Sequence, residues 1–195
     1  AVDFFEAAQK AGVKPIIGCE VYTAPRTRFD KEAGVDNNIS HLVLLCENQK
    51  GYDNLIKIVS SGFVDGFYYK PRVDTAIIRK HSEGIIALSA CLAGEIPKLL
   101  LDGDYEGAKK KALEYLEIFG EGNFYLEFQD HGIAEQKKLN PLILKLSKET
   151  GIPLVATNDV HYLKKEDAVY QDVLLCIQTA RTVDEKGNGS SRINA

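Results

Sequence analysis

Five short apolar runs recur along the chain, and each has the length of a β-strand. Their residues are apolar almost without interruption, as in strands that are buried on both faces. The expected strands cover residues 15–22, 41–46, 84–89, 123–128 and 152–157. Glycine, proline or polar residues bound these runs, which supports strand ends at those points.

Amphipathic segments, with apolar residues three or four positions apart, occupy much of the remaining chain. The expected helices cover residues 2–11, 51–62, 102–119, 134–150 and 166–179. Asp102 or Asp104 can cap the third helix, Gly151 is placed to end the fourth, and Pro141 is expected to kink or break it. The alternation of strands and helices predicts an α/β fold with a parallel sheet covered by helices.

The segment 24–39 is polar and rich in arginine, aspartate and asparagine, so we expect a long loop on the functional rim. No domain boundary is evident before residues 187–195, a polar stretch that resembles a flexible linker or a cloning remnant. We therefore expect one domain over residues 1–186. The chain contains no Met, and its natural start is expected to lie outside these residues.

The composition is that of a globular domain, with 195 residues, 45% hydrophobic and 27% charged. This length suits one full core or one large piece of a bigger barrel. The net charge of −4 disfavours tight, sequence-independent binding of duplex DNA by this segment alone, although a local basic groove stays possible. The four cysteines form no C-x-x-C motif, and no apolar run is long enough to cross a bilayer. We expect reduced thiols, no membrane association and a cytoplasmic location.

Asp159 and His161 follow the last apolar strand run. Residues i and i+2 of an extended backbone point to the same side, so the two side chains can aim at one point. Mixed oxygen and nitrogen ligands suit a divalent metal, zinc or manganese above all. The same pair also fits a strand that leads into a loop with two solvated polar residues.

Three more metal-capable residues lie at strand boundaries: Glu20, His41 and Cys91. Taken singly, each fits a solvated strand end, a capped histidine or a small buried hydrophobe. Because strand ends converge at one face of a parallel α/β barrel, all five residues together predict a shared metal site. A carboxylate such as Glu20 can bridge two cations, and a pair of cations can clamp a phosphoryl group.

Several motifs resemble those of the PHP (polymerase and histidinol phosphatase) domain. They cover residues 18–22, 40–45, 66–74, 88–95, 125–132 and 156–162. The run Phe67-Tyr68-Tyr69-Lys70-Pro71-Arg72 and the run Ala156-Thr157-Asn158-Asp159-Val160-His161-Tyr162 are similar to the branch found in the alpha subunit of the bacterial replicative DNA polymerase. The resemblance extends over roughly residues 1–186.

This resemblance implies an irregular seven-stranded (β/α) barrel, here lacking its first strands, with up to three zinc, manganese or iron ions at its C-terminal face. Glu20 would be the bridging carboxylate, His41 and Cys91 would bind one outer metal, and Asp159 and His161 would close the cluster. The family's opening His-x-His strand and Thr-Asp-His turn do not occur in this sequence.

The resemblance also implies a function. An intact site would carry out metal-dependent 3′-5′ proofreading cleavage at a DNA primer end, with Asp159, His161 and Glu20 as catalytic residues, inside a larger DNA-directed DNA polymerase. One alternative is a catalytically inert module that serves as a scaffold and docks other domains and subunits of the polymerase. Another is a free phosphatase that acts on a small phosphate ester, although the polymerase-like runs weigh against it.

Basic residues near these motifs are candidates for contact with the nucleic-acid backbone or with neighbouring polymerase domains. They are Arg26, Arg28, Lys70 and Arg72. Solvated loop positions or intramolecular ion pairs fit them equally well. His131 follows the fourth strand and could contact a phosphate or a metal, or be an ordinary loop histidine. His81 precedes the third strand, so we expect it on the far side of the barrel in a structural role.

Overall fold

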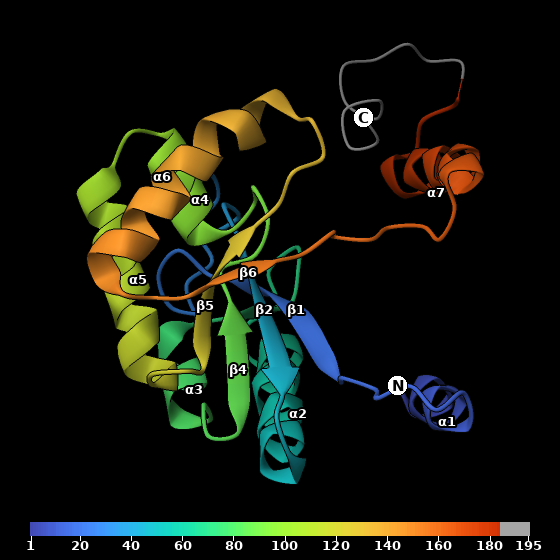
Figure 1. Cartoon of the computed structure of the whole chain (residues 1–195), viewed down its shortest axis with the longest axis horizontal. Coiled ribbons are helices and arrows are strands. Elements are labelled where there is room, and N and C mark those ends of the chain that lie inside the picture. Colours follow the sequence, from blue (N-terminus) through green and yellow to red (C-terminus); the bar gives the residue numbers. More distant parts are fainter. Residues whose placement is uncertain (184–195) are drawn as a thin grey trace.

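A single mixed sheet organises the computed structural model, which describes residues 1–183 (Figure 1). Its strands are β1 (Gly18–Thr23), β2 (Ser40–Cys46), β3 (Arg72–Val73), β4 (Ile85–Leu88), β5 (Phe124–Phe128) and β6 (Leu154–Ala156). Their order across the sheet is β3-β1-β2-β4-β5-β6. The α/β class expected from the sequence is confirmed, and the sheet has six strands within the described residues. The expected tail at residues 187–195 lies outside them.

The sheet is not wholly parallel, which corrects the sequence-based prediction. β2 pairs antiparallel with both β1 and β4, whereas β1 with β3, β4 with β5 and β5 with β6 are parallel pairs. A parallel connection needs a crossover, usually a helix, and the segment between β1 and β2 forms only loops and turns. The reversal brings the start of β2 to the same edge of the sheet as the ends of β1 and β4.

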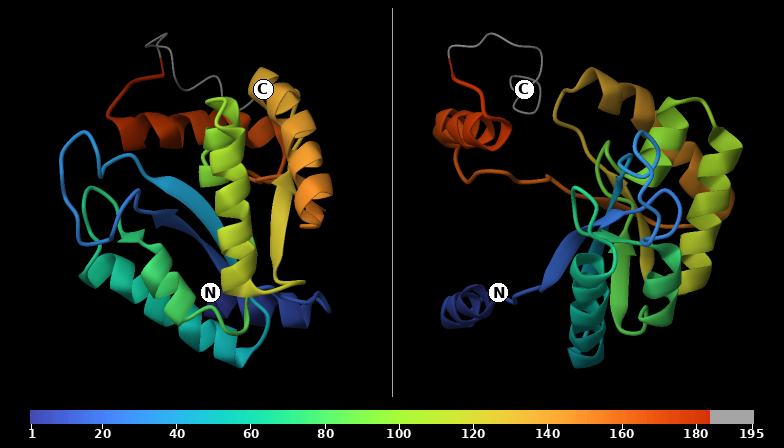
Figure 2. Two further views of the ribbon diagram at one scale, coloured as in Figure 1. Left: turned by 90° about the vertical axis from the view of Figure 1, so that its left-hand side faces the viewer. Right: turned by 180° about the vertical axis from the view of Figure 1, so that it is seen from behind.

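Seven helices accompany the sheet in the described chain. They are α1 (Val2–Lys10), α2 (Gln49–Val64), α3 (Thr75–Lys80), α4 (Glu95–Leu101), α5 (Tyr105–Phe119), α6 (Ala134–Thr150) and α7 (Ala168–Thr179), the last preceded by the 3-10 turn η1 (Lys165–Asp167). The helices α2 to α6 gather around one side of the sheet, whereas α1 and α7 stand apart from this body (Figures 1 and 2). None of these helices combines the length and the hydropathy needed to span a membrane.

Helix ends follow local chemistry. Asp104 caps α5, because its carboxylate accepts the backbone N–H of Gly107 at 2.9 Å. Gly151 ends α6 in the left-handed conformation at φ 75°, as the sequence predicts. The break expected at Pro141 does not occur: α6 continues through it, and the apolar residues Leu139 and Ile143 on either side are buried in the core.

The helices α2 to α6 pack against one face of the sheet and leave the other face largely uncovered. Alternate residues such as Leu42, Leu44 and Phe124 point toward α2 to α6 and are almost fully buried. Intervening residues such as Val43 and Tyr125 lie on the other face and are only half-buried, although Leu88 and Glu127 on that face are buried. We call this second side the open face. Glu20 and Glu127 share it, so it also carries the polar chemistry of the sheet.

Candidate metal centre

Three metal-capable side chains meet on the open face. The side chains of Glu20, His41 and Cys91 place one ligand atom each within 4.8 Å of the other two. In the β1–β2 ladder His41 lies opposite Tyr22, so Glu20, two residues before Tyr22, is its diagonal neighbour on the same face. The Glu20 Oε1 atom lies 2.8 Å from Nδ1 of His41.

A tight turn after β4 delivers the cysteine. Ala90, immediately before Cys91, has a left-handed backbone with φ 65°, and the His41 N–H donates to the carbonyl of Ala93 at 2.9 Å. Gly94 closes the turn so tightly that a Cβ there would lie 2.1 Å from the carbonyl oxygen of Ser89. The backbone of this turn is therefore tied to the first residues of β2, which keeps Cys91 beside His41.

The electrostatics of the cluster favour a positive charge on the His41 imidazole. Contact with Cys91, and then with Glu20, raises the pKa of His41 to about 9. The contact between the Glu20 carboxylate and the His41 imidazole lowers the pKa of the Glu20 carboxyl. The buried Nδ1 atom of His41 has no well-aligned hydrogen-bond partner among the described residues, although the carboxylate is close. A carboxylate, an imidazole and a thiol at this spacing form a donor set that fits zinc, and the imidazole would lose its proton on binding.

Asp159 and His161 border the same site from the segment after β6. They line one pocket together with His41 and Cys91. Asp159 does not lie on an extended strand, because β6 ends at Ala156 and Asp159 has φ 45°. The two side chains therefore reach the pocket from a turn, which corrects the geometry expected from their i, i+2 spacing. His161 Nδ1 lies 2.7 Å from the carbonyl oxygen of Asp159 and 4.0 Å from its Oδ1.

The pocket is lined by four of the five predicted ligands, not including Glu20, and by further residues. Its lining includes His41, Cys91, Leu92, Ala93, Gln129, His131, Ile133, Glu135, Gln136, Asn158, Asp159, Val160, His161 and Tyr162. Both ring nitrogens of His131 are engaged by protein groups: Nδ1 lies 3.0 Å from Gln136 Nε2 and Nε2 lies 2.9 Å from the carbonyl oxygen of Asn158. In this conformation both ring nitrogens of His131 contact protein groups, which favours the loop-histidine alternative.

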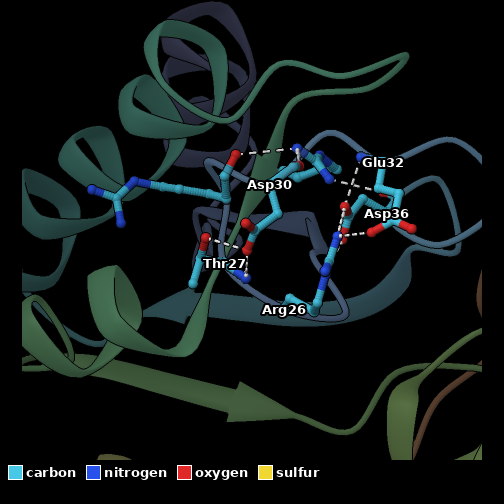
Figure 3. A network of polar contacts seen from close by, with 7 residues as sticks. Arg26, Thr27, Asp30, Glu32 and Asp36 are labelled. Carbon is cyan, nitrogen blue, oxygen red and sulfur yellow. Dashed lines mark hydrogen bonds and ion pairs between the residues drawn. The ribbon is translucent and has the colours of Figure 1, made fainter.

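The four basic candidates differ in their exposure and in their partners. Arg26 pairs with Asp36 and, at 2.9 Å, with Glu32 inside the loop between β1 and β2 (Figure 3). Lys70 is exposed, with its ammonium 5.9 Å from the centre of the Tyr22 ring. Arg28 pairs with Asp74 at 3.1 Å. Of these side chains, Lys70 is the one without a carboxylate partner in the described ion pairs.

The predicted contact of Arg72 with a nucleic-acid backbone is wrong, because the Arg72 side chain is completely buried. Its guanidinium donates to the backbone carbonyls of Gly66, Asp36, Arg28 and Asp30, at 3.0, 2.8, 3.1 and 2.8 Å. A group that is saturated in this way cannot contact a nucleic acid on the surface. It ties the loop after β1 to the segment before β3.

His81 lies where the sequence predicts, away from the pocket. It ends α3 and precedes β4, whereas Cys91 follows the opposite end of that strand. Burial, with Lys57 and other nearby lysines, lowers the pKa of His81.

Sequence reasoning missed a buried polar group on β5. Glu127 and Gln129 are each only 7% exposed, and Gln136 of α6 is 3% exposed. These three residues and Cys91 all line one small cavity. The sequence contained a clue to this group. Glu127 and Gln129 are two positions apart at the end of an apolar strand run, and such a spacing points both side chains to one face.

The fold and the donor set together define an α/β module with a cluster of side chains that could hold a metal ion. The family model of the PHP domain matches residues 1–131, and the chain belongs to this family. It is 47% identical over 182 residues to DNA polymerase III subunit alpha of Treponema pallidum (strain Nichols), which covers 93% of this chain. The corresponding subunits of Borreliella burgdorferi (strain ATCC 35210 / DSM 4680 / CIP 102532 / B31) and Thermus aquaticus are 46% and 45% identical, each over 95% of this chain. The chain spans only 16%, 16% and 15% of these three relatives.

Proposed function

We propose that this chain is the PHP module of a bacterial DNA polymerase III subunit alpha and that it hydrolyses phosphodiesters at the 3′ end of a DNA primer. The observation that carries the proposal is the convergence of Glu20, His41 and Cys91 beside the pocket that Asp159 and His161 also line. The polymerase relatives, similar along nearly the whole chain, support the parent protein. The proposed module spans residues 1–186.

The side chains divide into two groups in this proposal. Glu20, His41 and Cys91 would hold one divalent ion, zinc or manganese, and Asp159 and His161 would complete a site for up to three ions together with the family's other ligands. The metal supplies a Lewis acid for the phosphodiester. Asp159 accepts the proton of the attacking water, and His161 keeps that carboxylate oriented. Glu20 keeps His41 in place through their 2.8 Å contact.

The open face supports the seven-stranded barrel as the full fold. Val43, Leu45 and Ile86 on that face are half-buried and have no helix over them, so further strands packed against them would bury apolar area. A closed barrel would also remove the free edges of β3 and β6. We therefore place the missing family ligands on strands that complete this barrel.

The proposed partners are the DNA primer end and the other domains and subunits of the polymerase, all in the cytoplasm. Of the four basic candidates, Lys70 is the one we assign to phosphate contact, because it is exposed and has no carboxylate partner in the described ion pairs. Arg26 keeps half of its side chain accessible, although its donors face two carboxylates. DNA contact by this module alone stays local, in line with the net charge of −4.

An inert scaffold within the same polymerase is the second candidate. The observation that favours it is the exposure of the Asp159–His161 pair, which lies outside the compact three-residue cluster. In that case the site would hold at most one structural ion.

Replacing Asp159 with Asn tests the proposal in the full-length protein. The amide keeps the shape and removes the negative charge, so release of terminal nucleotides from a mispaired primer with Mn²⁺ or Zn²⁺ should disappear, while nucleotide addition is largely retained. His161→Ala should behave alike, and His81→Ala should match the wild type. Undiminished, chelator-insensitive cleavage by Asp159→Asn would refute the site. No cleavage by the wild type would favour the scaffold.

A further inference from the structure

A buried carboxylate lies behind the pocket. Glu127 is 7% exposed, and its Oε1 accepts hydrogen bonds from Gln129 Nε2 at 2.9 Å and from the hydroxyl of Thr157. Its Oε2 atom is buried with no hydrogen-bond partner among the described residues. Burying a carboxylate is costly unless its interactions compensate, so a role for Glu127 beyond filling space is expected.

The network continues from Glu127 to the rim of the pocket. Gln136 Nε2 donates to Gln129 Oε1 at 3.4 Å and lies 3.0 Å from Nδ1 of His131, while Gln136 Oε1 accepts the His131 backbone N–H at 2.8 Å. With Nδ1 accepting, Nε2 of His131 carries the proton and donates to the carbonyl of Asn158 at 2.9 Å. The network thus reaches the residue next to Asp159.

The backbone it contacts is strained. Asp159 has φ 45°, a left-handed conformation that L-residues adopt at a cost and that surrounding contacts must maintain. Several hydrogen bonds hold the two residues before it, including one from Gln129 Nε2 to the Thr157 hydroxyl at 3.1 Å. The Thr157 N–H donates to the carbonyl of Phe128 at 3.2 Å, its hydroxyl bonds Glu127, and the Asn158 carbonyl accepts from His131.

We propose that Glu127 and His131 are positioning residues, which hold Thr157 and Asn158 so that Asp159 and His161 turn into the pocket. This inference rests on the proposed function for its purpose, although the conformation itself can be tested without any metal. It also explains why both ring nitrogens of His131 are occupied. The histidine acts on the loop after β6, which carries Asp159 and His161, and does not touch the substrate.

Hydrogen exchange of the metal-free, full-length protein tests the conformation. His131→Phe keeps a ring but loses both ring hydrogen bonds, and Thr157→Val removes the hydroxyl that donates to Glu127 and accepts from Gln129. Each should speed exchange in residues 157–162 by at least about fivefold to tenfold, the factor expected when a single hydrogen bond is lost. His131→Gln should restore protection, because its amide can donate to Asn158. His81→Phe is the matched control and should leave this segment unchanged.

A titration with Co²⁺ alone tests the link to the site. His131→Phe should weaken by about 10-fold to 100-fold the binding that depends on Asp159 and His161, as loss of an outer hydrogen bond does at metal sites. The thiolate-to-cobalt absorption from Cys91 should persist. Unchanged exchange in His131→Phe and Thr157→Val, or no rescue by His131→Gln, would overturn the positioning role. A wild type that binds no Co²⁺ would refute the metal function instead, and the exchange result would still decide the positioning role.

Discussion

At the scale of single residues, Arg72 holds more of the backbone than any other side chain around β3. Its buried guanidinium bonds carbonyls of residues 28, 30, 36 and 66. Lysine keeps the charge but cannot present donors in the same planar fork. We expect Arg72→Lys to lower the free energy of unfolding by about 2–4 kcal/mol, measured by urea denaturation.

The exposed Lys70 provides the comparison for this substitution. Lys70→Ala should change the free energy of unfolding by less than about 0.5 kcal/mol, as is usual for surface positions. Equal stabilities of Arg72→Lys and the wild type would show that the four carbonyl contacts contribute little.

Asp36 should make the stability of the fold depend on pH in a direction that can be predicted. Its hydrogen bonds to Arg26 lower the pKa of the carboxyl from an ordinary 3.8 to about 2. A group with a depressed pKa in the folded state stabilises the fold above its unfolded value, and that stability is lost as the pH falls from about 4 to about 2. Asp36→Asn should therefore be less stable than the wild type at pH 6, with the difference narrowing below pH 4. Denaturation curves at both pH values check this, and a pH-independent difference would contradict it.

The residue types of the site could be predicted from the sequence, but the burial of individual cations could not. Glu20, Cys91 and Asp159 stand out because acids and thiols at strand ends are visible in a one-dimensional pattern. Arg72 looks identical to a surface arginine, since the four carbonyls around it come from segments that only the folded chain brings together. The same holds for His131 and its partner Gln136.

At the scale of elements, the start of α5 offers a paired test. The sequence allows Asp102 or Asp104 as the cap, and in the structure Asp104 accepts from Gly107, whereas Asp102 ends α4. Asp104→Ala should cost about 1 kcal/mol of unfolding free energy, and Asp102→Ala much less. Thermal unfolding of the two variants side by side provides the measurement. Equal losses would mean that the cap contributes nothing specific.

Periodicity predicted the long elements and failed on the short ones. The predicted helix at 134–150 coincides with α6, and each of the five expected strands overlaps a strand of the sheet. The two-residue β3, the six-residue α3 and the seven-residue α4 were missed, because such segments are too short to show a repeat. The antiparallel direction of β2 could not be predicted either, because the pattern of hydrophobic residues does not show in which direction a strand runs in the sheet.

At the scale of the whole molecule, apolar surface is left uncovered on one side. Phe4 of α1 is 58% exposed and Ile177 of α7 is 72% exposed, and both helices stand apart from the body of the molecule (Figures 1 and 2). The half-buried side chains of the open face, such as Val43, add to this surface. Exposed apolar area of this kind favours association unless another segment covers it.

We therefore expect the isolated 195-residue chain to self-associate. In a longer polypeptide that supplies the remaining strands of the proposed barrel, this surface should be covered and should no longer mediate association. Sedimentation velocity at several concentrations distinguishes the two. Phe4→Lys combined with Ile177→Lys should reduce the association without changing the circular dichroism, because neither side chain belongs to the core beneath α2 to α6. A monodisperse monomer of the unmodified 195-residue chain would contradict the expectation. It would also remove the main physical support for additional strands over the open face, because that face would then be stable in contact with water.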